Sequence, residues 1–188
     1  MLKKIPFTGT KEILARFALS AEAKPLLQPR FSPLEAMERL IEASLLTDYV
    51  NFVAHALPPR EGICWALAIQ HDYFLKDTQE APQIREAVRS WVHSPSEDKR
   101  RQILAKAEEV GTSVPTGWLC YAVGWNGSGS IADPKGPVVL PPPYLHAKAL
   151  LGAVALIPIN SEGEIQSLLK TAHKATLQVA NGDWPTVF

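Results

Sequence analysis

The sequence predicts an all-α fold, a single compact domain of about nine helices with one long proline-rich loop. Signals that start and stop helices recur along the chain, and apolar residues follow them at spacings of three and four. No segment alternates apolar and polar residues over five or more positions, as a half-buried strand would. The 188 residues are enough to bury one core, so residues 1–188 are expected to form one domain, either an irregular bundle or stacked antiparallel helical pairs.

The first half of the chain contains a complete helix-start signal. Ser32 is expected to cap the helix, Pro33 suits the first helical position, and Glu35 completes a capping box. One face of this helix is apolar through Leu34, Met37, Ile41 and Leu45. Its neighbours along the chain are expected over residues 10–19 and 46–57, the second ended by a pair of prolines.

The next run, residues 61–75, is apolar on nearly every side between Ile63 and Ile69. A helix with this pattern is typically surrounded by others, so it is predicted to be the central buried helix. The run over residues 82–92 is apolar on one side only, which predicts a helix at the edge of the core.

A second capping box is predicted at Ser94, Pro95 and Glu97, and Gly111 is the expected C-terminal cap of that helix. Three further helices complete the set, the last beginning at Ser161 and ending near Gly182; they are expected over residues 115–125, 143–157 and 161–182.

Residues 126–143, here called the strap, lack helical periodicity and are rich in glycine and proline. The glycines at its start, Gly124, Gly127 and Gly129, suggest a phosphate loop, but such a loop leads directly into a helix N-terminus and this one leads into prolines. A helix C-terminal cap at Gly124 or Gly127 is therefore favoured.

The strap has two interpretations. The prolines at 134, 137 and 141–143 favour a stiff, extended path. In one interpretation the strap only connects two helices, and Val138, Val139 and Leu140 pack on the core. In the other it also forms a binding surface, because loops of this length are usually functional or disordered, and Trp and Tyr residues on loops often contribute to interfaces. The predicted protein-binding residues are Trp125, Asn126, Pro137, Pro141 and Tyr144.

Patterns for catalysis, metal or cofactor binding are weak, and no residue is assigned to these roles. Cys64 and His71 are seven residues apart, about 10 Å along a helix, which is too far for the hydrogen bond that activates a thiol. Cys64 and Cys120 are interpreted as small buried apolar residues. An enzyme would most plausibly use a pocket formed by Arg60, Glu61, His71 and His146.

Charge and hydropathy limit the class of protein. Lys and Arg number 19, as do Asp and Glu, and this balance disfavours a general nucleic-acid binder. The longest apolar run, residues 149–159, is shorter than the ~20 residues of a membrane span, and the N-terminus lacks the pattern of a signal peptide. A soluble, cytoplasmic protein is expected. The C-terminal residues 181–188 either dock back through Trp184 and Phe188 or form a free partner motif.

Three stretches, "REGICWALA", "EAVRSWVHSPSEDKRRQILAKAEEVGTSVPTGWLCYAVGW" and "VVLPPPYLHAKALLGAVAL", resemble an uncharacterised family of bacterial helical proteins. The resemblance spans residues 60–156, and some members of that family are encoded near type VI secretion genes. It implies an adaptor, accessory or immunity protein and transfers no catalytic residues. The expected function is therefore non-enzymatic protein–protein interaction, as a secretion-system accessory, adaptor or effector chaperone. An immunity protein that binds a toxin and a small helical enzyme are the alternatives.

Overall fold

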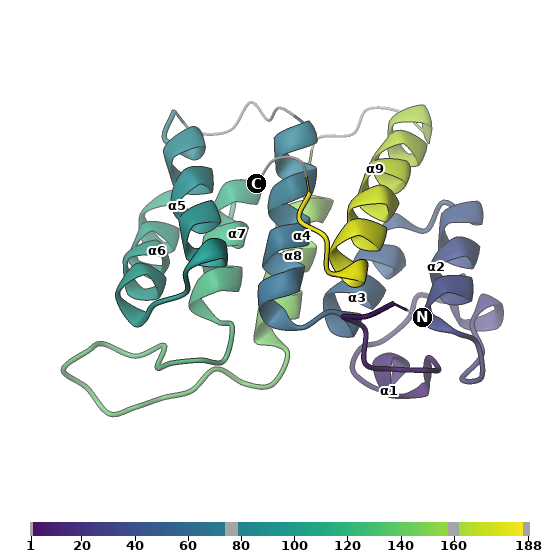
Figure 1. Cartoon of the computed structure of the whole chain (residues 1–188), viewed down its shortest axis with the longest axis horizontal. Coiled ribbons are helices and arrows are strands. Elements are labelled where there is room, and N and C mark those ends of the chain that lie inside the picture. The colour runs from purple at the N-terminus through teal and green to yellow at the C-terminus, as the bar shows by residue number, and fades with distance from the viewer. Residues whose placement is uncertain (1, 74–78, 158–161, 186–188) are drawn as a thin grey trace.

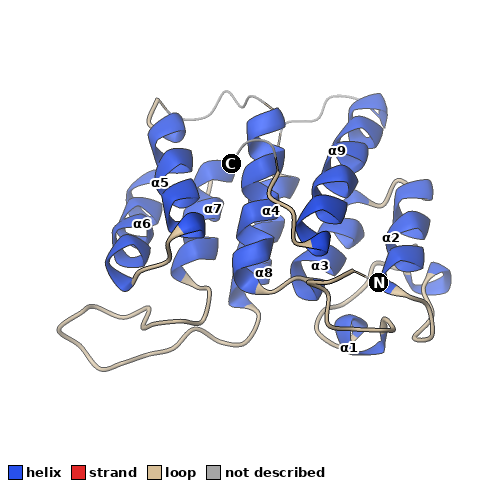
Figure 2. Cartoon of the chain, in the orientation of Figure 1, coloured by secondary structure: helices blue, strands red, loops and turns tan. Residues whose placement is uncertain are grey.

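The computed structural model describes residues 2–73, 79–157 and 162–185, and within them it confirms the all-α fold. Nine α-helices and one short 3-10 helix are present in these ranges, with no strand (Figure 2). The elements are α1 (Lys11–Leu14), η1 (Lys24–Leu26), α2 (Pro33–Glu42), α3 (Leu46–Ala56), α4 (Pro59–Asp72), α5 (Ala81–His93), α6 (Glu97–Val110), α7 (Pro115–Gly124), α8 (Leu145–Ala155) and α9 (Glu162–Asn181).

The helices form two packed rows (Figure 1). One row consists of α5, α4 and α9, and the other consists of α6, α7, α8 and α3. Helix α2 closes one end of the array against α3 and α9. Consecutive helices from α3 to α9 run in alternating directions, so the fold is a two-layer stack of antiparallel helices (Figure 1).

Helix α4 is the central element, as its all-round apolar pattern predicts. It packs against α3, α5, α7, α8 and α9, and all of its residues from Gly62 to Gln70 are buried. The Trp65 indole N–H donates to the Ala172 carbonyl of α9 at 3.0 Å. The Gln70 amide donates to the carbonyls of Pro115 at 3.1 Å and Ala153 at 2.9 Å, which joins α4 to α7 and α8.

The predicted capping box at the start of α2 is confirmed. The Ser32 hydroxyl accepts a hydrogen bond from the Glu35 backbone N–H at 3.3 Å, and the Glu35 carboxylate accepts one from the Ser32 backbone N–H at 2.8 Å. Ser161, the predicted cap of the last helix, lies outside the described residues.

The predicted cap at Ser94 is wrong by two residues. Ser94 is the C-terminal cap of α5, and α6 begins after Ser96, whose hydroxyl accepts from the Lys99 backbone N–H at 3.3 Å. With Ser96 as the cap, Glu97 is the first residue of α6 and the third helical position is Lys99, which has no carboxylate to complete a capping box. The Glu97 carboxylate instead binds the Arg100 guanidinium at 2.7 Å.

Gly111 ends α6 with φ of +77°, as predicted, and its carbonyl group lies against Gly117 of α7. A Cβ on Gly117 would meet the carbonyl oxygen of Gly111 directly and would lie 3.3 Å from Val110 Cγ1. The absence of a side chain at Gly117 therefore allows α6 and α7 to approach closely.

We predict that Gly117→Ala destabilises the protein by roughly 1–3 kcal/mol, although alanine is the better helix former. The added methyl group must displace backbone atoms, which cannot move as a flexible side chain can. Urea denaturation would measure the loss. Gly62→Ala is the matched control, since its Cβ would meet only the end of the Leu150 side chain at 2.7 Å. Equal stability of the two variants would contradict the close approach.

The three glycines at the start of the strap have structural roles. Helix α7 ends at Gly124, where a Cβ would collide with Leu104 of α6, and Gly127 turns the chain with φ of +95°. The C-terminal cap itself is Trp125, the residue after Gly124, so neither Gly124 nor Gly127 is the cap. Gly129 lies against α6, where a Cβ would be 3.0 Å from the Arg100 guanidinium.

The strap extends beyond the ends of the helices on the side of α5 and α6 (Figure 1). Val138 is 80% exposed, Val139 45% and Leu140 60%, so the predicted packing of these three residues on the core is wrong. The reason is that the strap pairs with itself. The Ile131 N–H donates to the Val139 carbonyl at 2.8 Å, and the Val139 N–H donates to the Ser130 hydroxyl at 3.0 Å.

Arg100 holds the base of the strap, and its side chain is fully buried. Its guanidinium donates to the Gly124 carbonyl at 2.6 Å and to the Ser130 carbonyl at 2.7 Å, while Glu97 balances its charge. These bonds satisfy carbonyls at the end of α7 and at the start of the strap. The buried cation thus fixes the direction in which the strap leaves the helices.

We expect Arg100→Ala to lower the free energy of unfolding by roughly 2–4 kcal/mol, because two carbonyls lose a charged donor. Amide hydrogen exchange of residues 130–139 should also become faster. Arg101→Ala is the control: its side chain is 30% exposed and its bond to the Ala132 carbonyl is 3.4 Å, so its loss should cost less than about 1 kcal/mol. Unchanged exchange in Arg100→Ala would contradict the role of this residue.

Candidate functional site

The most distinctive concave surface lies where the strap leaves α7 and returns to α8. We call it the strap groove. It has a volume of about 460 Å³ and is walled by aromatic rings, histidines and prolines, with lining residues from five parts of the chain. The residues that matter below are Phe7, Arg16, His55, Trp125, Tyr144 and His146, with prolines 58, 59 and 141–143 at the rim.

The groove brings together four of the five predicted protein-binding residues: Trp125, Asn126, Pro141 and Tyr144. The fifth, Pro137, lies on the exposed outer part of the strap and does not line the groove.

Trp125 and Asn126 both serve the end of α7 as well as the groove. One side of Trp125 packs on Tyr121, with ring centroids 4.5 Å apart, so the ring is partly buried. The Asn126 amide donates to the Val123 carbonyl at 2.6 Å, and its oxygen accepts from the Ser128 N–H at 2.9 Å. The polar atoms of Asn126 are therefore engaged in the turn, and Trp125 offers the groove its remaining surface.

Arg16 is the principal cation of the groove. Its guanidinium carbon lies 4.6 Å from the centroid of the Phe7 ring and 4.7 Å from that of Tyr144, within the range of cation–π attraction. Its Nη1 donates to the His55 carbonyl at 2.7 Å. Over the described ranges, Arg16 forms no ion pair.

Sequence reasoning missed Phe7, Arg16 and His55. Arg16 was placed in a helix over residues 10–19, but α1 ends at Leu14 and Arg16 lies in the following turn. No local pattern distinguishes it from other arginines, because its ring partners lie 9 residues before it and 128 residues after it (16 − 7 and 144 − 16). Only the folded arrangement identifies this cluster.

Tyr144 occupies an unusual backbone conformation immediately before α8. Its φ is +61°, in the left-handed region, where a bulky side chain costs about 1 kcal/mol or more. This conformation aims the ring at Arg16 and at His55, whose ring centroid is 5.7 Å away. The strain is offset by these contacts, and such strain is commonly found at functional sites.

Two histidines lie beside Arg16, and both are largely buried. His55 stacks on Phe17 at 5.0 Å, and its Nδ1–H donates to the Asn51 carbonyl at 2.8 Å. Burial and the nearby Arg16 and Lys148 charges lower the pKa of His55 despite this bond. Burial, His55 and Arg16 lower the pKa of His146 to about 4. Both rings are therefore neutral at pH 7, and Arg16 carries the charge of the cluster.

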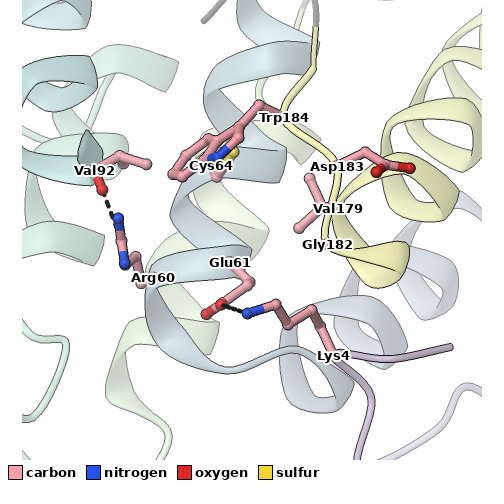
Figure 3. Close-up of a pocket in the computed structure, with 9 residues that line it drawn as sticks. All are labelled: Lys4, Arg60, Glu61, Cys64, Val92, Val179, Gly182, Asp183 and Trp184. Carbon is pink, nitrogen blue, oxygen red and sulfur yellow. Dashed lines mark hydrogen bonds and ion pairs between the residues drawn. The ribbon is translucent and has the colours of Figure 1, made fainter.

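A second, smaller cleft of about 100 Å³ lies along α4 (Figure 3). Lys4 pairs with Glu61 at 3.2 Å, and Arg60 Nε donates to the Val92 carbonyl at 2.6 Å. Burial, and secondarily the Glu61 charge, raise the pKa of the Cys64 thiol to about 12. The thiolate that nucleophilic catalysis requires is thus strongly disfavoured at neutral pH.

The C-terminal segment docks back onto this cleft through Trp184. Its ring stacks on His93 at 5.0 Å and lies 5.4 Å from the Arg60 guanidinium, over Cys64 (Figure 3). This is one of the two arrangements expected for the C-terminus; Phe188 lies outside the described residues.

The four residues of the suggested enzyme pocket do not converge. Arg60 and Glu61 line the α4 cleft, whereas His146 lines the strap groove. His71 is exposed beside Asp72 at the far end of α4, three turns from Arg60. The reason is the length of α4, which separates its two ends by roughly 16 Å.

The described part of the chain is thus an all-α, two-layer helical stack with a projecting strap and a groove lined by aromatic side chains and Arg16. Residues 36–180 match the model of a family described as "Family of unknown function (DUF6931)", and the chain belongs to that family. No curated protein and no solved structure matches the chain. Among the described helices, none combines the length and apolarity required to cross a bilayer.

Burial of His146 predicts a dependence of stability on pH. The folded pKa of about 4 lies below the ordinary value of 6.5, so between these values only the unfolded chain takes up the proton. The free energy of unfolding should therefore fall by about 3 kcal/mol from this group as the pH drops from 6.5 to 4. Urea denaturation across this range would measure the slope.

His146→Leu should reduce the change in the free energy of unfolding with pH, because leucine fills the site without binding a proton. His71→Leu, at an exposed histidine, should retain the slope of the wild type. A His146→Leu variant with the wild-type slope would contradict the assignment.

Proposed function

We propose that this protein is a non-enzymatic interaction protein that binds a protein partner with the end of the helical stack that carries the strap. The proposal rests mainly on one observation: three consecutive apolar residues, Val138, Val139 and Leu140, here called the apolar strap segment, are held in solvent where the strap returns toward its base. Exposed apolar clusters of this kind are typical of interfaces.

The order of the strap supports this role. Arg100 and Ser130 hold its base through hydrogen bonds, and the Gly136 N–H donates to the Asp133 carbonyl at 2.9 Å near its outer end. A strap that is ordered before binding loses less conformational entropy when a partner docks. Its prolines have the same effect, because they restrict the unbound chain.

The class of partner comes from the resemblance to bacterial helical proteins encoded near type VI secretion genes. It favours an accessory factor, adaptor or effector chaperone that meets a secretion component or effector in the bacterial cytoplasm. An immunity protein is the alternative within the same class, but the even charge balance of 19 to 19 does not favour the strongly charged face such proteins often have. The raised pKa of Cys64 weighs against a thiol-dependent enzyme.

The test is a paired substitution, Val138→Asp with Leu140→Asp. Both side chains are exposed, so the variant should keep the wild-type melting temperature but should lose its partner, because burying two carboxylates at an interface is costly. Tagged wild type and variant would be expressed in the native host, and co-purified proteins would be quantified by mass spectrometry.

Leu34→Asp is the matched control, since Leu34 is also exposed, at 37%, but lies on α2 away from the strap. It should retain the partner. Loss of the partner in this control, or its retention by the double variant, would contradict a role for the apolar strap segment. Recovery of no partner together with turnover of a small molecule would overturn the proposed function.

A further inference from the structure

We propose that the strap groove binds an extended, acidic peptide segment of the partner, with a carboxylate of that segment paired to Arg16. This inference rests on the proposed function, because it names the chemistry of a second contact with the same partner. The observation behind it is that Arg16 lies between the Phe7 and Tyr144 rings, in a groove whose described lining residues include no Asp or Glu.

The charge of the groove is one-sided. Over the described ranges, none of its lining residues is Asp or Glu, whereas Arg16 is permanently charged and Lys148 lies near His55. Two other cations of this part of the fold have carboxylate partners: Lys4 pairs with Glu61, and Arg100 with Glu97. Among the described residues, no carboxylate pairs with Arg16, so its guanidinium is available to an acidic group of a ligand.

The position of Arg16 is fixed before any ligand arrives. The Phe7 and Tyr144 rings and the His55 carbonyl orient the guanidinium, and only Nη1 donates to that carbonyl. A guanidinium has five N–H donors in a planar fork, so the remaining donors can form the paired hydrogen bonds that carboxylates accept. The apolar walls lower the local dielectric, which strengthens the attraction relative to an exposed arginine.

The shape of the walls favours an extended chain over a helix or a small anion. Trp125 and Tyr144 present partly exposed rings, Tyr144 at 38%, and prolines at 58, 59 and 141–143 form stiff rims. Grooves with aromatic walls typically recognise extended, proline-containing segments, whose prolines pack between the rings. The groove volume of about 460 Å³ accommodates several side chains of such a segment.

The experiment compares two libraries of short peptides that share a Pro-x-x-Pro pattern. One library has glutamate at a single fixed position and the other has glutamine there. Binding to the wild-type protein would be measured by fluorescence polarisation, and the site would be located by the NMR shift of the ¹⁵N-labelled Trp125 indole. We expect the glutamate library to bind roughly tenfold more tightly, since a charge-assisted hydrogen bond distinguishes the two.

Two arginine variants assign the effect to Arg16. Arg16→Gln should remove the preference for glutamate, whereas Arg39→Gln should retain it. Arg39 is the matched control, because it also lies over an aromatic ring, Phe31, at 4.4 Å, but on the surface of α2. Arg16→Lys keeps the charge without the fork and should show an intermediate preference.

Equal binding of both libraries, or binding of neither, would overturn the inference, and this comparison uses only the wild-type protein. So would competition by inorganic phosphate at equal potency to the peptides, which would indicate a small-anion site. The double variant Val138→Asp with Leu140→Asp should still bind the glutamate library. If it loses its cellular partner but binds the peptides, both proposals are supported. If the double variant keeps both its cellular partner and the peptides, the proposed role of the apolar strap segment is contradicted, while the inference about the strap groove is not.

Discussion

The structure depends on the burial of α4. A helix that is apolar on every side must be enclosed, and α4 is enclosed by α3, α5, α7, α8 and α9. Five neighbours around one axis impose two rows of helices, and short connections make consecutive helices antiparallel. Polar bonds set the register within this apolar contact, because Gln70 and Trp65 reach carbonyls on three different neighbours.

Because the helices alternate in direction, their connections lie at the two ends of the stack. One of these ends carries the strap and the residues around Arg16. The strap leaves α7 and returns to α8 there, beside the end of α3 and the N-terminal turns. This explains how Phe7, Arg16, His55 and Tyr144, which are distant in sequence, form one cluster. The apolar strap segment and the strap groove are thus two parts of a single surface, one projecting and one concave.

Local features were predictable from sequence, while contacts between distant segments were not. The nine α-helices of the described ranges follow from periodicity and caps, and Ser32 with Glu35 forms the predicted box. The predicted Ser94 cap is wrong because a second serine two residues later, Ser96, caps α6, and Ser94 ends α5. Trp125 and Tyr144 were identifiable as aromatic residues flanking an irregular segment. Arg16 was not, since its role arises only from the rings that folding brings to it.

The closed base of the strap gives the fold a modular element. Hydrogen bonds at Ser130 and Val139 bring the two sides of the strap together. Arg101 of α6 still reaches the Ala132 carbonyl, and the residues beyond it, 133–138, are exposed. Because loop-closure entropy grows slowly, a doubling of such a segment costs only about 0.6 kcal/mol. The outer strap can therefore change its length and composition during evolution, or by engineering, while the helical stack stays constant. Such a scaffold can acquire a new recognition sequence without redesign of its core.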